Sequence, residues 1–453
     1  MGLQRGLQWP LRVTPGESSH PLVTGDGVEE MFGGIIDRYW LSSDAVAIHV
    51  EPDVPLYVSI SKDHLCLESR RDRDFPYQTT HPIVLKYTIC TGKNIRSLHK
   101  DMMLNYRSLI TDTAGRVFLT SPIWVASPRK VLSQESIQDF ANRIMEHTSK
   151  LPGFLLFDSR WQKQEGSLDF NETTFPNPRE ILKILHNKGF RVLLTIHPFA
   201  CLPSRVFEQA STERLLVSDK WKKVPLLTKW HSKVCGLLDF TNNNTSSWFL
   251  ERLLKLKKKY DIDGFVKAQF YTRFRSRIPF TKFSWICKTY PRTVSWDSLS
   301  GLGSVIPEVL TLGILGYPLV NPGSVGGDGS GEIPSKELYL RWMELVVFLP
   351  IVQFTITPGD YDQEVVNVVN NLFSVREELV LPLYRAALEQ FPDTAAPLVR
   401  PLWWIAPEDV HAQMCGSQFL VGEQIMVAPI LEDGRRSRRY LFTSWLVERP
   451  SSW

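Results

Sequence analysis

Residues 153–199, GFLLFDSRWQKQEGSLDFNETTFPNPREILKILHNKGFRVLLTIHPF, decide the fold. The short apolar run at 153–157 is typical of a buried strand, and FRVLLTI at 190–196 is typical of a second one. Between them, residues 178–188 have helical spacing, with proline first and Gly189 directly after the last residue. A strand, a helix and a strand joined by short connections predict two parallel strands.

The same alternation continues on both sides of this stretch. Ser133 suits an N-cap for a helix over 134–147, and further helical patterns lie at 248–260 and 306–316. Residues 262–270, IDGFVKAQF, predict another buried strand. The pattern fits either a doubly wound sheet or an eight-stranded barrel. No glycine fingerprint such as GxGxxG follows the first strand, which argues against dinucleotide binding.

Composition excludes several classes of function. The 453 residues carry a formal charge of +4, with 43% hydrophobic and 22% charged residues, which is ordinary for a soluble globular protein. This charge gives no reason to expect nucleic acid or an anionic membrane as the main partner. The lysine cluster at 255–259 closes a helical pattern, so a solvated helix end is favoured over a binding patch. No motif indicates a cofactor.

The cysteines and sequons bear on the compartment. Six cysteines are dispersed without a CxxC pair, so no metal site is expected. Cys66 and Cys90 both lie in β-like runs, and a disulfide between them is a candidate. N-glycosylation sequons occur at Asn171, Asn243 and Asn244. Residues 1–20 contain no long apolar run, so we expect a cytosolic chain or a fragment or isoform without an upstream targeting segment.

Polar residues follow several predicted strands, where barrel enzymes place their chemistry. Asp158 is either a sugar-hydroxyl acceptor or general base, or a loop carboxylate that caps a backbone. His197 either donates to a ligand or is a satisfied core histidine, and Lys267 either contacts ligand or extends to solvent. Trp124 and Trp230 either stack on sugar rings or pack under loops. No obvious pair of carboxylates emerges, which a retaining glycosidase needs at about 5 Å.

These residues resemble glycoside hydrolase family 31. The stretch SLDFNETTFPNPREILKILHNKGFRVLLTIHPF is similar to its second and third barrel units, LLDFTNNNTSSWF to its fourth-strand region, and ELYLRWMELVVFLP to its Arg-Trp helix. RPLWWIAP and QFLVGEQIMVAPIL resemble the junction with the C-terminal β module. The resemblance covers roughly residues 28–440, in order and with compatible spacing.

The resemblance implies an α/β fold centred on a TIM (β/α)8 barrel. It implies a flexible leader at 1–27, an N-terminal β-sandwich at 28–115, the barrel at 116–392 and an incomplete C-terminal β domain at 393–453. Members of the family are typically retaining exo-glycosidases for α-linked sugars. The full-length form is expected to be lumenal, secreted or a type II membrane protein, although this chain shows no signal peptide or transmembrane segment.

The family's catalytic carboxylates do not carry over. Its nucleophile falls on Ala268 without a gap, or on Gln269 if the preceding lysine is matched. Its acid/base falls near Thr293, where no carboxylate stands, and two sugar-binding aspartates become Ser159 and Gly323. The retained ligand candidates are those at the strand ends and on the Arg-Trp helix: Trp124, Asp158, His197, Trp230, Lys267, Arg341 and Trp342.

Three functions remain open. The first is a family 31 pseudoenzyme that binds a glycan, a small anionic ligand or a protein partner. The second is a weakly active, α-galactosidase-like glycosidase that uses displaced carboxylates, with Asp261, Asp263 or Asp297 as candidates. The third is a purely structural or adhesion module. Because Ala268 and Gln269 cannot ionise, we expect neither to form a glycosyl-enzyme intermediate.

Overall fold

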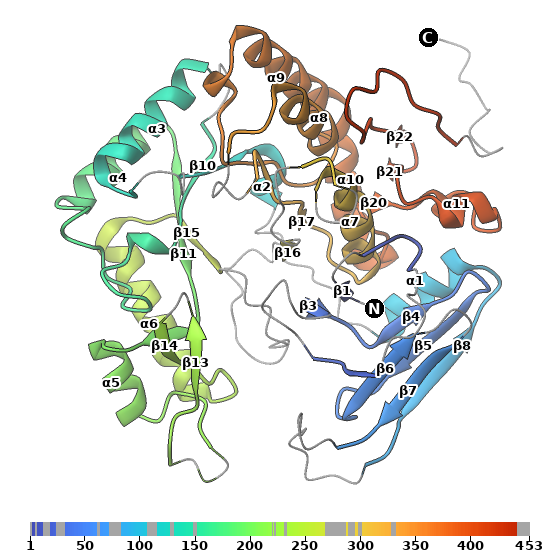
Figure 1. Cartoon of the computed structure of the whole chain (residues 1–453), viewed down its shortest axis with the longest axis horizontal. Coiled ribbons are helices and arrows are strands. Elements are labelled where there is room, and N and C mark those ends of the chain that lie inside the picture. The colour runs from blue at the N-terminus through green and yellow to red at the C-terminus, as the bar shows by residue number, and fades with distance from the viewer. Residues whose placement is uncertain are drawn as a thin grey trace.

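The structure is a computed structural model. It describes residues 2–4, 7–11, 19–23, 32–60, 64–71, 83–106, 116–126, 131–147, 152–219, 221, 223–230, 233–267, 287–288, 295–297, 301–327 and 332–441. Figure 1 shows a β-rich N-terminal part, a large α/β body and a small C-terminal part beside it. No helix in these ranges is long and apolar enough to span a membrane.

The N-terminal part consists of small antiparallel sheets, as the sequence predicted. The strands of the two three-stranded sheets, in sheet order, are β4 (Tyr39–Leu41), β5 (Val46–Val50) and β8 (Tyr87–Thr91), and β2 (His20–Pro21), β6 (Leu56–Ile60) and β7 (Leu65–Ser69). A separate apolar core includes Trp40 and Val50 from the first sheet and Leu56 from the second. The opposite face of β5 carries Ala47, which packs into the core of the body.

The expected flexible leader is partly packed onto the body. β1 (Gly2–Gln4) pairs antiparallel with β3 (Phe32–Ile36). Leu7 is only 5% exposed and belongs to the main core. An apolar side chain and a strand partner hold these residues, so they are part of the folded body.

The disulfide expectation was wrong in its partners. Cys66 on β7 and Cys90 on β8 do not form a disulfide, and the two strands belong to different sheets. The structure instead joins Cys201 to Cys235. These residues are register partners on β12 (Phe199–Cys201) and β14 (Lys233–Leu237), so the strand pairing itself brings the sulfur atoms together.

The body is built on a parallel sheet of six strands in the order β15-β11-β10-β9-β19-β18. Their bounds are β9 (Ile123–Val125), β10 (Phe154–Phe157), β11 (Arg191–Ile196), β15 (Gly264–Lys267), β18 (Ser324–Val325) and β19 (Gln353–Phe354). A further parallel pair joins β16 (Cys287–Lys288) to β17 (Val320–Asn321). The parallel strands predicted from the strand–helix alternation are therefore confirmed.

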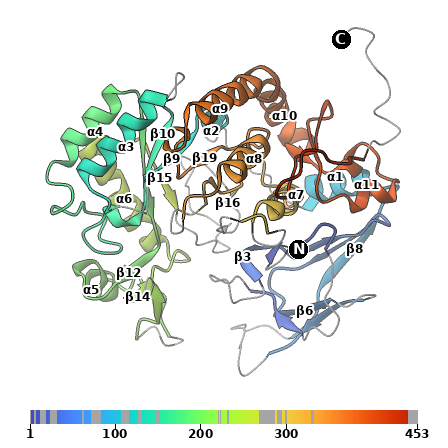
Figure 2. The ribbon, with the colours of Figure 1, turned by 45° about the horizontal axis from the view of Figure 1, so that its top comes forward.

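Helices surround the parallel sheet, except the first, which packs against β5, and the last, which lies beside the small C-terminal part (Figures 1 and 2). They are α1 (Ile95–Tyr106), α2 (Val117–Thr120), α3 (Gln134–His147), α4 (Pro178–Asn187), α5 (Arg205–Thr212), α6 (Asn243–Tyr260), α7 (Val305–Ile314), α8 (Lys336–Val346), α9 (Gln363–Val375), α10 (Leu381–Thr394) and α11 (Val410–Met414). Their boundary signals are those read from the sequence. The Ser133 hydroxyl accepts the Ser136 N–H at 3.1 Å before α3, and Gly189 takes a φ of +86° after α4.

A buried arginine, Arg376, binds backbone carbonyls at the amino end of the parallel sheet. Arg376 lies on a π-helical turn (Arg376–Val380) and is 3% exposed. Its guanidinium donates to four backbone carbonyls, those of Leu119, Val347, Leu349 and Pro350, at 2.6–3.0 Å. Burial lowers the pKa of Arg376 to about 10. The residue joins the segments that enter β9 and β19, where regular strand bonding has not yet begun.

Besides the apolar contacts of Trp403, Phe419 and Leu420 in the main core, one carboxylate bonds the C-terminal part to the body. It contains an antiparallel sheet of β20 (Val399–Arg400), β21 (Phe419–Val421) and β22 (Ile425–Val427). Glu423 accepts bonds from Arg96 at 2.7 Å, Arg400 at 2.8 Å and the Trp404 indole at 3.2 Å. Arg96 lies on α1, whereas Glu423, Arg400 and Trp404 belong to the C-terminal part, so this group connects α1 to the C-terminal part.

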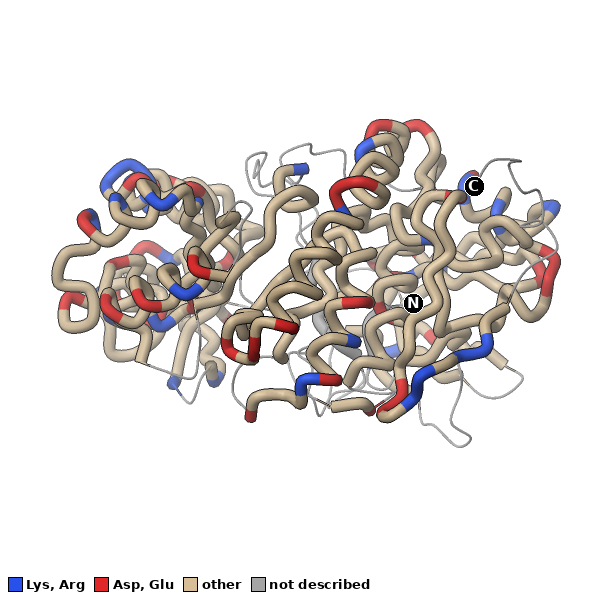
Figure 3. The backbone as a smooth tube through the Cα atoms, turned by 90° about the horizontal axis from the view of Figure 1, so that it is seen from above, with Lys and Arg blue, Asp and Glu red and all other residues tan. Residues whose placement is uncertain are grey.

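Charged residues are distributed along the whole described backbone. Figure 3 shows lysine and arginine interspersed with aspartate and glutamate, without one sign covering a whole face. The lysines at the end of α6, Lys257 to Lys259, are exposed in its last turn, as expected of a solvated helix end. This distribution fits the modest net charge of +4.

Candidate functional site

The strand ends that were expected to carry polar groups share one edge of the parallel sheet. β10 ends at Phe157 and β11 at Ile196, and β15 ends at Lys267, which pairs with Ile196. Because the three strands are parallel neighbours, Asp158 and His197 lie at the same carboxyl edge. The strand-end placement agrees with the sequence-based expectation.

Asp158 is held by its own turn. Its carboxylate accepts the Arg160 backbone N–H at 2.9 Å and the Arg160 guanidinium at 2.5–3.0 Å. Ser159, at a substituted sugar-ligand position, begins the short helical turn that Asp158 caps. Asp158 is therefore both a capping carboxylate and one half of an ion pair that is partly open to solvent, with side-chain exposures of 24% and 41%.

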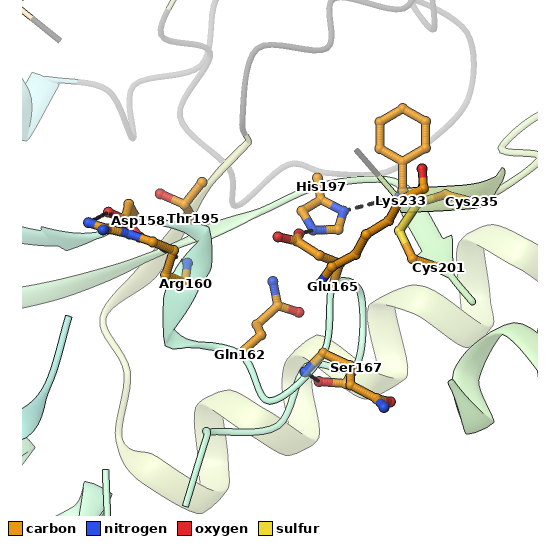
Figure 4. Close-up of polar contacts among 12 residues, drawn as sticks. Asp158, Arg160, Gln162, Glu165, Ser167, Thr195, His197, Cys201, Lys233 and Cys235 are labelled. Carbon is orange, nitrogen blue, oxygen red and sulfur yellow. Dashed lines mark hydrogen bonds and ion pairs between the residues drawn. A yellow bond between two sulfur atoms is a disulfide. The ribbon is translucent and has the colours of Figure 1, made fainter. Parts of the chain in front are cut away.

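His197 forms a buried pair with Glu165. The His197 side chain is fully buried and Glu165 is 12% exposed, with Nε2 to Oε2 at 2.6 Å. The Phe199 N–H donates to Nδ1 of His197 at 3.3 Å. An accepting Nδ1 carries no proton, so Nε2 bears it and donates to the Glu165 carboxylate. Both ring nitrogens are occupied, and the pair ties the loop between β10 and α4 to the end of β11 (Figure 4).

Aromatic side chains and the disulfide adjoin this pair. The Trp230 ring lies 5.9 Å from the His197 ring and stacks on Phe199 at 4.7 Å. Trp230 ends β13 (Leu227–Trp230), which pairs with β14, and the Cys201–Cys235 disulfide lies in the same small sheet. The structure thus brings together two predicted residues, His197 and Trp230, beside the small sheet that the disulfide crosslinks. Figure 4 shows the disulfide near His197.

A second group of buried polar side chains lies on β17, β18 and β19, and none of its members is charged. The Asn321 amide donates to Gln353 Oε1 at 2.7 Å, and the Gln353 amide donates to the Ser324 hydroxyl at 2.5 Å. All three residues are at most 8% exposed. Gly323 contributes only its backbone N–H, which donates to Asn321 Oδ1 at 3.0 Å. Because Gly323 has no side chain, the neighbouring Ser324 supplies the hydroxyl that accepts the Gln353 amide hydrogen.

Neither Glu165 nor Gln353 was predicted as a site residue. Glu165 lies in an irregular loop, eight positions after the end of β10, and no periodicity marks it. Gln353 left a weak signal, because it is a lone amide that ends the apolar run FLPIVQF. Only the fold brings each of them to its partner.

Of the displaced carboxylates, Asp261 and Asp263 lie before β15, at the end opposite to the carboxyl edge. Asp263 precedes β15 and accepts bonds from the Val192 N–H at 2.6 Å and from His186 at 3.0 Å. At about 3.3 Å per strand residue, the opposite end of β15, at Lys267, is roughly 13 Å away. The Asp261 side chain is 98% exposed at the left-handed end of α6. Asp297 is also exposed.

Three predicted ligand residues lie elsewhere. Trp124 is 1% exposed, stacks on Phe354 and donates to the Pro152 carbonyl at 2.7 Å, so it packs the core. Trp342 is fully buried on α8. Arg341 pairs with Glu344 on the same helix at 2.9 Å. Among the described residues, Trp124 and Trp342 are therefore buried in the core and Arg341 is paired within its own helix.

The three sequons differ in how they present their hydroxyl residue. Thr173, two residues after Asn171, is exposed and donates its N–H to the Asn171 side chain at 3.1 Å. Asn243 and Asn244 are exposed in the first turn of α6. Their partner hydroxyls, Thr245 and Ser246, are buried at 0% and 9% exposure.

The substituted catalytic positions fall outside the described residues. This concerns Ala268, Gln269 and Thr293, and of Lys267 only the backbone is described. A surface cavity of about 640 Å³ occurs instead in the N-terminal part, lined by Glu51 to Asp53 and Leu85 to Tyr87. It is remote in sequence from every predicted site residue.

Comparisons with known proteins identify the parts of the chain. Residues 124–268 match the TIM-barrel domain of glycosyl hydrolases family 31, and residues 395–447 match the C-terminal domain of that family. Mouse myogenesis-regulating glycosidase is 31% identical over 486 aligned positions, covering 96% of this chain and 68% of the relative. SITS-binding protein of Tetronarce californica is 26% identical with the same coverage of both chains.

Solved structures agree on the architecture. A family 31 dextranase from Flavobacterium johnsoniae, complexed with glucose, superposes with a TM-score of 0.70 at 17% identity, over 92% of this chain and 57% of the dextranase. A family 31 α-xylosidase from a soil metagenome, complexed with xylose, gives 0.73 at 16% identity, over 96% of this chain and 71% of the xylosidase. At these identities the likeness concerns the fold, a (β/α)8 barrel with flanking β modules. The chain belongs to glycoside hydrolase family 31.

Proposed function

We propose that this chain is a family 31 protein that does not turn over glycosides and binds a ligand at the mouth of its barrel. One observation carries the proposal. From Gly264 to Trp296 the sequence contains no aspartate or glutamate, but it contains seven lysines and arginines. Both catalytic carboxylates of the family belong in this stretch, so no alignment within it restores the pair that a retaining mechanism requires.

The remaining carboxylates at the carboxyl edge support the same proposal. Asp158 is paired with Arg160, and Glu165 accepts a hydrogen bond from the proton-bearing Nε2 of His197. The Asn321–Gln353–Ser324 group can donate and accept hydrogen bonds but cannot ionise at neutral pH. Losing catalytic residues that act as a unit costs on the order of a millionfold in rate, which leaves binding as the available function.

Two ligand classes fit. The related dextranase and xylosidase structures contain glucose and xylose, which supports a carbohydrate. The name of SITS-binding protein and the seven lysines and arginines between 264 and 296, with no acidic residue among them in the sequence, support a small anionic ligand, because an excess of positive charge attracts anions. A protein partner at the same mouth is the third option.

Hydrolysis assays with purified protein test the proposal. We expect aryl α-galactosides, α-glucosides and α-xylosides to be hydrolysed at the uncatalysed rate, and Asp158→Asn to leave that rate unchanged. Thermal stability in saturating galactose, xylose or an aromatic sulfonate then identifies the ligand class. Turnover that Asp158→Asn or Glu165→Gln abolishes would instead establish the alternative, a weak α-galactosidase-like enzyme, which the 31% identity to myogenesis-regulating glycosidase favours.

We also propose a lumenal or secreted location for the full-length protein. The buried Cys201–Cys235 bridge supports it, because structural disulfides persist in oxidising compartments. Asn171 is the expected glycosylation site because the hydroxyl residue of its sequon, Thr173, is exposed, whereas Asn243 and Asn244 depend on buried hydroxyl residues. Loss of a mass shift on glycosidase treatment of Asn171→Gln, compared with Asn243→Gln, tests this assignment.

Residues 28–115, 116–392 and 393–453 are proposed as the sandwich, the barrel and the C-terminal β module.

A further inference from the structure

The strand β8 forms one edge of the N-terminal sheet β4-β5-β8, at the margin of the molecule (Figures 1 and 2). The Gly92 N–H donates to the Ala45 carbonyl at 3.0 Å, which sets the alternation of bonded pairs between β8 and β5. Tyr87, Ile89 and Thr91 therefore direct their N–H and C=O groups away from β5. In the part of the chain that the structure describes, no hydrogen bond reaches these outward groups.

The other sheet edges of the N-terminal part carry features that prevent further pairing, whereas β8 does not. β7 contains Glu68, which pairs with Arg70 at 2.9 Å, and β2 ends in Pro21. On β4, Tyr39 and Trp40 are buried. β8 has no charged residue and no proline, and its register with β5 continues over five residues without a bulge. Such an edge is a template for pairing with another strand.

The stretch that contains β8 also exposes large apolar side chains. Four of the nineteen exposed large hydrophobic residues in the described ranges lie here: Ile83 at 47%, Val84 at 48%, Tyr87 at 52% and Ile89 at 54%. Tyr87 and Ile89 are the register partners of Val50 and Ile48, which pack in the core between the two sheets. Because paired residues point to the same face, the apolar face of this sheet continues past that core to the outer edge.

We propose that β8 pairs with β8 of a second copy of this chain, antiparallel and centred on Ile89. In this register the outward groups of Tyr87 meet those of Thr91 in the second copy, and Ile89 lies beside its counterpart. All three residues then form backbone hydrogen bonds, and the two sheets become one continuous sheet. A shift by one residue would oppose these groups to residues that already bond to β5. The contact is self-complementary, as a two-fold interface requires.

The charges at the end of β8 fit the same register. The surface cavity of about 640 Å³ lies here, lined by Glu51, Asp53 and Tyr87 among others. Asp53 pairs with Lys86 at 3.4 Å, whereas Glu51 is an exposed carboxylate beside them. In the proposed pairing the second copy's chain leaves its β8 at this cavity, which brings its exposed Lys93 toward Glu51. Opposite charges across an interface fix its register, and this contact occurs twice in a two-fold dimer.

Sedimentation of the intact chain over a range of concentrations tests the pairing. One short strand buries less surface than a standard interface, so we expect a dimer with a dissociation constant between about 1 and 100 µM. Ile89→Lys places two lysines opposite each other on the two-fold axis and should weaken the dimer at least about tenfold. Leu254→Lys, which changes an equally exposed leucine on α6, should dimerise like the parent chain. Both variants should keep the parent thermal midpoint, because both side chains are 54% exposed.

Charge reversal tests the register. Lys93→Glu should weaken the dimer about threefold to tenfold, because it replaces two attractive contacts with repulsive ones. The double variant Glu51→Lys/Lys93→Glu exchanges the charges and should restore the affinity to within about twofold of the parent. Lys258→Glu makes the same reversal at an exposed position of α6 and should have no effect. Failure of the double variant to recover would contradict the register centred on Ile89.

Hydrogen exchange followed by mass spectrometry distinguishes strand pairing from side-chain packing. Above the dissociation constant, residues 83–92 should gain protection of about three amides, those of Tyr87, Ile89 and Thr91. The Ile89→Lys variant should show no gain at the same concentration. A chain that stays monomeric throughout this range, a dimer that Ile89→Lys leaves intact, or a dimer without added protection at 83–92 would each overturn the proposal.

Discussion

The amino and carboxyl ends of the parallel sheet treat their buried polar groups differently. At the amino end, one cation, Arg376, satisfies four backbone carbonyls and has no carboxylate among its hydrogen-bond partners. At the carboxyl end, the polar side chains bond one another, as in His197 with Glu165 and Asp158 with Arg160. Arg376 connects backbone segments to one another, whereas the ionisable side chains at the carboxyl end form pairs with nearby side chains.

The contacts at the amino end stabilise the barrel, whereas the carboxyl end is where a barrel enzyme places its catalytic side chains. Family 31 architecture is retained, as the TM-scores of 0.70 and 0.73 show. At the carboxyl end, His197 has no ring nitrogen left for proton transfer, and Asp158 already accepts several donors from Arg160. We therefore expect changes at the amino end to affect folding most, and changes at the carboxyl end to affect ligand binding.

Replacing Arg376 should have the largest effect on stability. Arg376→Met retains an apolar stem but leaves four buried carbonyls without their donor. At about 1–3 kcal/mol for each unsatisfied buried group, partly relieved by relaxation, we expect a loss of roughly 4–6 kcal/mol. Urea unfolding followed by circular dichroism, together with the yield of soluble protein, measures it.

Arg385 provides the matched control for this change. It is exposed on α10, and Arg385→Met removes the same charge without orphaning a buried acceptor. We expect a shift within about 0.5 kcal/mol, as for other surface substitutions. Comparable losses for both variants would show that Arg376 contributes charge rather than its carbonyl contacts, and the contrast between the two ends would fail.

The sequence predicted the alternating parallel strands and helices well because their signals are local, whereas the resemblance to family 31 was needed to choose a barrel over a doubly wound sheet. Apolar runs, the Ser133 cap and Gly189 after α4 each depend on neighbouring residues, and all three are present in the structure. Partner choice was less accessible. The Cys201–Cys235 bridge depends on the register of two strands separated by 34 positions, and the His197 pair depends on a loop glutamate with no pattern. Burial of Trp124 and Trp342 likewise follows from packing, which residue type alone does not specify.

Breaking the uncharged network should have an intermediate effect. Gln353→Leu keeps the side-chain volume close but removes the acceptor of Asn321 and the donor of Ser324. Two orphaned groups at about 1–3 kcal/mol each, less the benefit of an added apolar side chain, predict a loss of roughly 2–3 kcal/mol. The unfolding midpoint in urea measures it.

A double replacement sharpens this prediction. Gln353→Leu/Asn321→Leu removes both partners, and such paired apolar replacements are often nearly neutral. Recovery of at least half of the lost stability is expected if the network is structural. No recovery would indicate that Asn321 has a separate role, such as contact with the bound ligand.

Glu165 should have a smaller effect on stability and a larger one on the site. Glu165→Gln keeps the shape but replaces a charged acceptor of the His197 proton with a neutral one. Charge-assisted hydrogen bonds are about twice as strong as neutral ones, so we expect a loss of about 1 kcal/mol. Affinity for the ligand that the thermal-shift experiment identifies should fall as well, because the loop after β10 loses its attachment to β11. Glu172→Gln, on an exposed part of the same loop, should alter neither quantity.

Asp158 gives the smallest expected effect and the clearest test of the contrast. The Asp158–Arg160 pair is solvent-exposed in part, and such pairs contribute about 0–1 kcal/mol, so Asp158→Asn should cost at most about 0.5 kcal/mol. Asparagine also caps a helical turn, which keeps the bond to the Arg160 N–H available. If the carboxyl end only binds, Asp158→Asn should change affinity without changing hydrolysis, which stays at the uncatalysed rate. A stability loss above 2 kcal/mol would place Asp158 with Arg376 among the residues that hold the barrel together, whereas a loss of measurable turnover would make it part of an active site.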